Sequence, residues 1–182
     1  GGVGGVGRTG SGEKGGVEQE YERGKAQYPV KTVGETTKTG TEVTFLPDRS
    51  IFTQTISYSY ETLANRMREL AFLNKGIKIQ LTDHRQKDDK GESVGELFHS
   101  EEGLKEFIRF LDANREPITA DVISMEGEKN DIPVEVAMVY NTSFTENLHS
   151  YVNNINTHEG GTHLSGFRLS LIHISEPTRH LF

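Results

Sequence analysis

Two histidines and a glutamate near the C-terminal end of the chain are residue types that zinc enzymes use. They are His158, Glu159 and His163 in the run His158-Glu159-Gly160-Gly161-Thr162-His163. Zinc proteases place their two histidines four residues apart on one helix, so that both rings reach the metal. Here the histidines are five apart, which on a helix would separate the rings by about 140°. A zinc-dependent hydrolase is therefore an alternative, and a loop is the favoured interpretation.

The two glycines inside this run favour a turn because glycine adopts backbone angles that other residues avoid. We expect a helix to begin near Thr162 and to continue through Phe167 and Arg168. Asn153, Asn154 and Asn156 precede the run, and we interpret them as turn residues whose side chains bond the local backbone.

The N-terminal segment, residues 1–16, is rich in glycine and contains two weak phosphate-binding patterns. Gly2 to Gly7 fits Gly-x-Gly-x-x-Gly, and Gly7 to Lys14 resembles a phosphate loop except that Glu13 stands before the lysine. Such patterns indicate a nucleotide site only between a strand and a helix, and no helical periodicity follows. We expect residues 1–16 to be a flexible or damaged stretch.

The C-terminal residues 169–182 include Leu169-Ser170-Leu171-Ile172-His173-Ile174-Ser175-Glu176-Pro177-Thr178-Arg179, which resembles the translation of a sequencing-library adaptor. We expect the natural protein to depart from this sequence near Arg168 or Leu169, so that the residues after this point give no information about its fold.

The composition is low in hydrophobic residues and high in glycine for a globular chain, partly because of the two ends, and the middle of the chain resembles an ordinary domain. The chain has 182 residues, a net charge of −7, 33% hydrophobic residues and no cysteine. The negative charge does not predict a broad nucleic-acid footprint. The absence of cysteine suits a reducing cytoplasm, and no apolar run reaches the length of a membrane span. We expect a cytoplasmic protein that does not contact a membrane.

Hydrophobic periodicity predicts an α+β fold. The clearest helix spans Tyr60 to Leu73, with Gly76 as its stop. A second helix is expected after Ser100, which would cap it, and would bury Leu104, Phe107, Ile108 and Leu111. Strands are expected at 17–23, 40–46, 77–81, 119–125, 133–140 and 147–155, with polar turns at 84–95 and 126–131.

Several motifs in order carry a family resemblance. They are Lys38-Thr39-Gly40-Thr41, Phe45-Leu46-Pro47-Asp48, Arg66-Met67-Arg68-Glu69-Leu70-Ala71-Phe72-Leu73-Asn74 and Glu159-Gly160-Gly161-Thr162-His163. Together they resemble the B subunit of bacterial DNA gyrase, to which the ATPase subunit of topoisomerase IV is similar. The resemblance covers residues 17–168.

The resemblance implies two parts of an ATP-driven clamp that passes DNA strands and introduces supercoils. Residues 17–116 would be the latter half of a Bergerat-type ATPase domain, a mixed sheet with helices. Residues 117–168 would begin a transducer domain of ribosomal-protein-like βαβ topology. ATP and Mg²⁺ are the implied cofactors. DNA, a gyrase A-type subunit and a second copy at the ATPase gate are the implied partners.

Only two site residues carry over from the family. Thr41 matches a threonine near the adenine end of the nucleotide, and its hydroxyl can donate and accept a hydrogen bond. Gly40 beside it would let the backbone approach closely. Taken alone, Thr41 is an ordinary strand residue.

The family's other catalytic groups have no counterpart in residues 17–168. They are a glutamate base, a magnesium-holding asparagine, an adenine-reading aspartate and a transducer lysine. Phosphoryl transfer depends on such positioned charges, so the chain alone is expected to be inactive, with no catalytic or metal residues of its own. A non-catalytic interaction module is a further alternative. Arg66, Arg68 and Glu69 are expected to form a solvated helix face, and His99 and His149 to have surface or packing roles.

Overall fold

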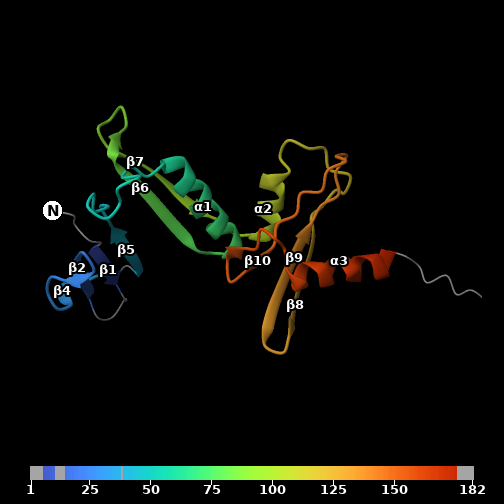
Figure 1. Ribbon diagram of the computed structural model, residues 1–182, viewed down its shortest axis with the longest axis horizontal. Coiled ribbons are helices and arrows are strands. Elements are labelled where there is room, and N and C mark those ends of the chain that lie inside the picture. Colours follow the sequence, from blue (N-terminus) through green and yellow to red (C-terminus); the bar gives the residue numbers. More distant parts are fainter. Residues whose placement is uncertain (1–5, 11–14, 38, 176–182) are drawn as a thin grey trace, which may run out of the picture. The chain divides into compact units, whose positions relative to one another are not determined.

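The computed structural model describes residues 6–10, 15–37 and 39–175 and shows an α+β chain. Chain contacts divide it into two compact units, Gly1–Ser59 and Tyr60–Phe182. Figure 1 labels most of the helices and strands. They are β1 (Val6–Gly10), β2 (Gly16–Glu22), β3 (Lys25–Ala26), β4 (Lys31–Gly34), β5 (Gly40–Thr44), α1 (Tyr60–Leu73), β6 (Lys78–Lys87), β7 (Ser93–His99), α2 (Leu104–Leu111), β8 (Ile123–Lys129), β9 (Ile132–Met138), β10 (Tyr151–Val152), β11 (Ile155–Asn156) and α3 (Thr162–Ser175).

The first unit is one sheet with the order β3-β2-β1-β5. β3 pairs with the end of β2, and β4 pairs with the start of β2. Every strand pair of the described residues is antiparallel, whereas the resemblance implied a mixed sheet. β1 lies within the glycine-rich segment and pairs with both β2 and β5. Residues 6–10 are therefore paired strand residues where a flexible or damaged stretch was expected. Residues 2–5 of the first glycine pattern and residues 11–14 of the second lie outside the described ranges.

The strands predicted at 17–23 and 40–46 are present as β2 and as a shorter β5. The turn from β2 to β3 uses Arg23 and Gly24, both with positive φ (51° and 78°). Two such residues suit the right-handed twist of paired strands. Val43 and Phe45 are more than half exposed, so the described residues provide little cover for β5.

Helix α1 has the predicted bounds and carries the core of the second unit. Its deepest residues are Ala64 and Ala71, which pack with Phe98 of β7. Small side chains let the helix approach the β6–β7 hairpin, along which it lies in Figure 1. Met67 and other partly buried residues surround this cluster. The chain leaves α1 at Gly76, whose φ is 85° and whose N–H donates to the Ser100 carbonyl (2.8 Å).

The β6–β7 hairpin is longer than the sequence predicted. Residues 84–95 were expected to be a turn, but β6 runs to Lys87 and β7 begins at Ser93. The tip is tightened by Asp88, whose carboxylate accepts from the amides of Lys90 and Glu92 (2.9 Å each). Polar residues form strands here because an exposed hairpin is held by backbone hydrogen bonds. It does not require alternating apolar side chains.

Helix α2 begins later than predicted, and its cap is Gly103. Ser100 instead accepts a hydrogen bond from the Gly103 amide (2.9 Å) and donates to Glu106 (2.5 Å). Glu101 and Glu102 therefore precede the helix. Of the four apolar residues expected to be buried, Phe107 is the one that is fully buried, while Leu104, Ile108 and Leu111 are half-buried.

The β8–β9 hairpin corrects two expectations. The strand expected at 119–125 is β8, which begins at Ile123 and extends through the predicted turn to Lys129. The actual turn is Asn130-Asp131, with φ of 53° and 61°. β9 confirms the strand expected from Pro133.

The strand expected at 147–155 is absent. In its place are the two-residue strands β10 and β11, joined by Asn153-Asn154 with φ of 50° and 64°. Asn153 and Asn154 are turn residues, as expected, whereas Asn156 lies in β11 and the Asn154 side chain bonds Asn74 (2.9 Å) instead of the local backbone. α3 begins at Thr162, also as expected. Among the described residues, no helix combines the length and apolar character needed to cross a bilayer.

Candidate functional site

Gly40 and Thr41 lie at the start of β5 in the first unit. Thr41 pairs with Thr9 of β1, and Gly40 pairs with Gly10. Both are exposed, and a Cβ built on Gly40 would meet none of the described protein atoms within 4 Å. The protein's own packing therefore does not require glycine here. The strand start is open to an approaching molecule, and the nucleotide role of the two residues stays a prediction.

Asp48 follows β5 and organises the loop there. Its carboxylate accepts hydrogen bonds from the hydroxyl and amide of Ser50 (2.7 and 2.8 Å) and from Arg23 Nε (2.7 Å). These bonds stabilise the ionised form and lower the pKa of Asp48 to about 2, the Ser50 hydroxyl contributing most. The sequence indicated Asp48 only as part of a motif that carries the family resemblance. Its pairing with Arg23 depends on the tertiary structure.

The three zinc candidates do not share a helix. Residues 157–161 turn between β11 and α3, with Gly160 at φ 74°, so His158 and Glu159 lie in the turn and His163 lies in α3. His163 Nε2 is 3.4 Å from Thr157 Oγ1. In the described part of the chain, no three acidic or histidine side chains gather as a metal site requires. The predicted loop is confirmed.

The outer face of α1 is not simply solvated, which corrects the expectation for Arg66 and Glu69. Arg66 pairs with Glu69 and donates from Nη2 to the Asn154 carbonyl (2.8 Å). Glu69 accepts from the Tyr151 hydroxyl (2.6 Å). Burial, followed by this bond to Glu69, raises the pKa of Tyr151. These residues attach the β10–β11 hairpin to α1.

Arg68 lies on the same helix but contacts other partners. Its guanidinium pairs with Glu96 (3.1 Å) and is 5.3 Å from the ring centroid of Phe98 and 5.6 Å from that of Phe110. Cations over aromatic faces are attracted by the ring quadrupole. Arg68 is therefore engaged within the protein, and its position gives no indication of a DNA contact.

A groove of about 510 Å³ lies where α1, α2 and the β10–β11 hairpin meet. Its aromatic part includes Phe72 stacked on Phe107 at 5.2 Å, with Tyr151 at 6.3 Å from Phe107. The groove is lined by Asn65, Arg66, Arg68, Glu69, Phe72, Phe107, Phe110, Leu111, His149, Tyr151 and Asn156. The polar side chains at the rim of the groove, such as Arg66, Arg68 and Glu69, are engaged by other groups of the protein.

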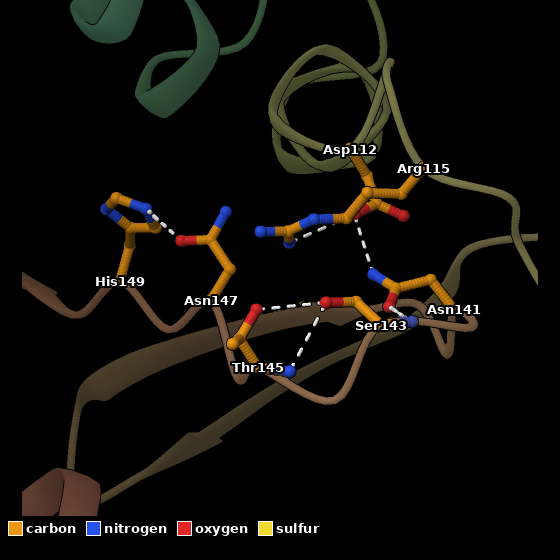
Figure 2. A network of polar contacts seen from close by, with 7 residues as sticks. All are labelled: Asp112, Arg115, Asn141, Ser143, Thr145, Asn147 and His149. Atoms are coloured by element: carbon orange, nitrogen blue, oxygen red, sulfur yellow. Dashed lines mark hydrogen bonds and ion pairs between the residues drawn. The ribbon is translucent and has the colours of Figure 1, made fainter.

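Figure 2 shows the polar segment that leads from β9 to this groove. Asn141 donates to Asp112 at the end of α2 (2.7 Å), and Arg115 pairs with the same carboxylate (3.4 Å). Further along, His149 Nε2 is 3.0 Å from Asn147 Oδ1. These contacts keep residues 141–149 irregular where part of a strand was expected. His149 is exposed, and its ring centroid is 6.3 Å from that of Phe107, in keeping with the expected surface or packing role.

Comparison with known proteins gives the family. The model of the DNA gyrase B family matches residues 103–176. The DNA gyrase B protein of Cytophaga hutchinsonii is 59% identical over 154 residues, which is 85% of this chain and 32% of the relative. That of Staphylococcus aureus is 46% identical over 156 residues, 86% of this chain and 24% of the relative. The chain belongs to the DNA gyrase B family.

Solved structures agree with membership of the gyrase B family. The 43K ATPase domain of Thermus thermophilus gyrase B, in complex with an aminocoumarin, superposes with a TM-score of 0.75 at 27% identity, over 91% of this chain and 44% of that one. The gyrase B protein of Myxococcus xanthus shares the fold, with a TM-score of 0.76 at 20% identity, over 93% and 48%. The chain spans about a third of the length of the first gyrase B relatives.

The gyrase B relationship does not favour the zinc hydrolase, since all the named relatives are gyrase B proteins. The family match extends into the segment from Leu169, whose adaptor origin stays a prediction.

Proposed function

We propose that this chain is part of the ATPase and transducer region of a type II DNA topoisomerase, which couples ATP binding and hydrolysis to DNA strand passage and supercoiling. The observation that carries this proposal is 59% identity over 154 residues to a DNA gyrase B protein. Identity at that level over most of the chain supports a shared role and a shared fold.

Within this proposal, residues 17–116 belong to the ATPase part and residues 117–168 begin the transducer, with its βαβ arrangement. Along the chain, the boundary between the two compact units instead falls between Ser59 and Tyr60. The difference is understandable because α1 and the β10–β11 hairpin, assigned to different functional parts, are bonded to each other. A functional boundary at 117 therefore runs through a packed unit.

Gly40 and Thr41 are proposed to face the adenine end of ATP. Their fit rests on the exposed Thr41 hydroxyl and on the open space beside Gly40. ATP with Mg²⁺ would supply the free energy of gate closure and resetting. The family resemblance implies that the magnesium-holding asparagine of a gyrase B protein lies outside residues 17–168. The chain by itself is proposed to be inactive as an ATPase.

The proposed partners are DNA, a gyrase A-type subunit and a second copy of the ATPase gate, in the cytoplasm. The test is a graft of residues 17–168 into the matching segment of Cytophaga hutchinsonii gyrase B, assayed with its gyrase A partner for ATP-dependent supercoiling. We expect supercoiling to be retained. A soluble graft that binds gyrase A and still fails to supercoil DNA would overturn the proposal.

The nucleotide contact is tested in the same graft. Thr41→Ala is expected to raise the KM for ATP by about tenfold, as the loss of one hydrogen bond to a bound ligand would do. Thr44→Ala is the matched control because Thr44 is an exposed threonine of the same strand with its side chain on the other face. Equal KM values for the two variants would remove Thr41 from the site.

A further inference from the structure

The β10–β11 hairpin is attached to α1 by side chains and backbone groups of its first strand and its turn. Tyr151 donates to Glu69 (2.6 Å), and Arg66 donates to the Asn154 carbonyl (2.8 Å). Asn154 Nδ2 also donates to Asn74 Oδ1 (2.9 Å). Hydrogen bonds to charged groups are about twice as strong as neutral ones, so the attachment is substantial.

The hairpin's own ladder is too short to hold it in place. Each strand has 2 residues, and Val152 and Ile155 are 49% and 66% exposed. An isolated two-stranded hairpin is marginal in water even when longer. Its position therefore depends on the contacts with α1 and on the aromatic contact between Tyr151 and Phe107.

The base of the hairpin is closed by Ser150 and Thr157 and leads into the turn that precedes α3. Ser150 and Thr157 are joined by their hydroxyls (2.5 Å) and by the bond from the Thr157 amide to the Ser150 carbonyl (2.8 Å). Thr157 then accepts from the Gly160 amide (2.8 Å) at its carbonyl. A Cβ on Gly160 would lie 3.0 Å from Leu164 Cδ2, so the turn packs closely against α3.

We propose that residues 150–157 form a strut that couples α1 to the first turn of α3. The tip of the strut is anchored at Asn154 by Arg66 and Asn74 of the α1 segment, and its first strand is anchored at Tyr151 by Glu69. The other end is the Ser150–Thr157 closure and the turn that continues into α3. Loosening the contacts with α1 therefore lowers the stability of the α3 start, although the Asn154 tip and the Ser150–Thr157 closure lie at opposite ends of the strut.

Two adjacent asparagines provide a matched test. Asn153 and Asn154 both have positive φ, so replacing either by glycine keeps the turn conformation. The Asn154 side chain bonds Asn74, whereas Asn153 is exposed. We expect Asn154→Gly in the full chain to accelerate hydrogen exchange of the Thr157 and Ser165 amides by about three- to tenfold. Asn153→Gly should leave both rates within about twofold.

Tyr151→Phe is the second variant, because it removes the hydroxyl and keeps the ring beside Phe107. It should accelerate exchange at the same two amides by about tenfold. The internal reference is the Phe107 amide of α2, which donates to the carbonyl of the cap residue Gly103 (3.1 Å). Acceleration at Thr157 without acceleration at Ser165 would overturn the strut, leaving only a local hairpin. Equal effects of Asn153→Gly and Asn154→Gly would overturn it as well. If Tyr151→Phe unfolds the chain, the asparagine pair decides.

Discussion

The β8–β9 and β10–β11 hairpins turn in the same way but are held by different forces. Each turns on two residues with positive φ, Asn130-Asp131 in the first and Asn153-Asn154 in the second. Such pairs favour the turn that matches the strand twist. β8 and β9 have 7 residues each, whereas β10 and β11 have 2.

The long hairpin has backbone pairing and little cover, and the short one has little pairing and several side-chain anchors. Val134 and Ile132 of β9 are 56% and 63% exposed. Tyr151 of β10 is half-buried and bonded to Glu69. The same kind of turn therefore occurs in the β8–β9 hairpin, which is stabilised by its own backbone pairing, and in the β10–β11 hairpin, which is positioned by contacts with other segments.

The largest expected effect contrasts one residue from each hairpin. Tyr151→Ala removes a ring from the Phe107 cluster and the bond to Glu69, and should lower the free energy of unfolding by about 2–3 kcal/mol. Val134→Ala, at an exposed ladder position, should cost less than about 0.5 kcal/mol. Urea unfolding of the two variants measures the difference. Similar losses would show that the two hairpins are held in the same way.

A middle-sized effect tests the turn chemistry that the hairpins share. Asn130→Ala and Asn153→Ala should each destabilise by about 1 kcal/mol, because alanine is strained at positive φ. Glycine at either position is the control and should be close to neutral, since it adopts this conformation freely. Thermal unfolding of the four variants compares them. A glycine variant as unstable as its alanine counterpart would mean that the asparagine side chain, not its backbone angle, is what matters.

The smallest effect concerns charge on the long hairpin. Glu135 faces Glu126 across the ladder. Partial desolvation, together with the facing Glu126, raises the pKa of Glu135. The folded state therefore holds the proton more tightly, and this site gains stability as pH falls from neutral toward the ordinary glutamate pKa of 4.5.

Glu135→Gln should thus stabilise the chain at pH 7 by a few tenths of a kcal/mol, roughly the cost of like charges directly opposed. The gain should disappear below about pH 4, where the wild-type carboxyl is protonated. Glu128→Gln is the control because Glu128 faces Pro133. Unfolding measured at both pH values checks the sign, and a gain that is equal at both would exclude the charge explanation.

Strong periodicity made the elements of the second unit predictable in part. Helix α1 has the predicted bounds because its apolar stripe and the glycine after it agree. Helix α2 was recognised, but its start was placed too early, since Ser100 bonds the Gly103 amide from outside the helix. The sequence predicted Ser100 as the cap residue itself, whereas the cap in the structure is Gly103. Ser100 is buried and bonds the Gly103 amide from outside the helix.

The residues of the candidate sites were predicted only in part from the sequence. Four motifs in order, one of which contains Gly40 and Thr41, were enough to indicate a family, and the identity to gyrase B relatives agrees. The anchoring role of Arg66 and Glu69 was missed because charged residues on a helix normally face water. Their partners, Tyr151 and Asn154, are more than 80 residues away, and no local pattern links such positions.

The sequence by itself determined the α+β class, the main helix, the turn glycines and asparagines, and the family resemblance. The helix and the turns depend on interactions between residues close in the sequence, so hydrophobic periodicity and the backbone preferences of glycine and asparagine predict them. Only the tertiary structure decided that polar residues 84–87 extend β6, that residues 147–155 do not form one strand, and that Glu69 holds Tyr151. Those outcomes depend on which distant groups come together, and burial and hydrogen bonding across that distance select them.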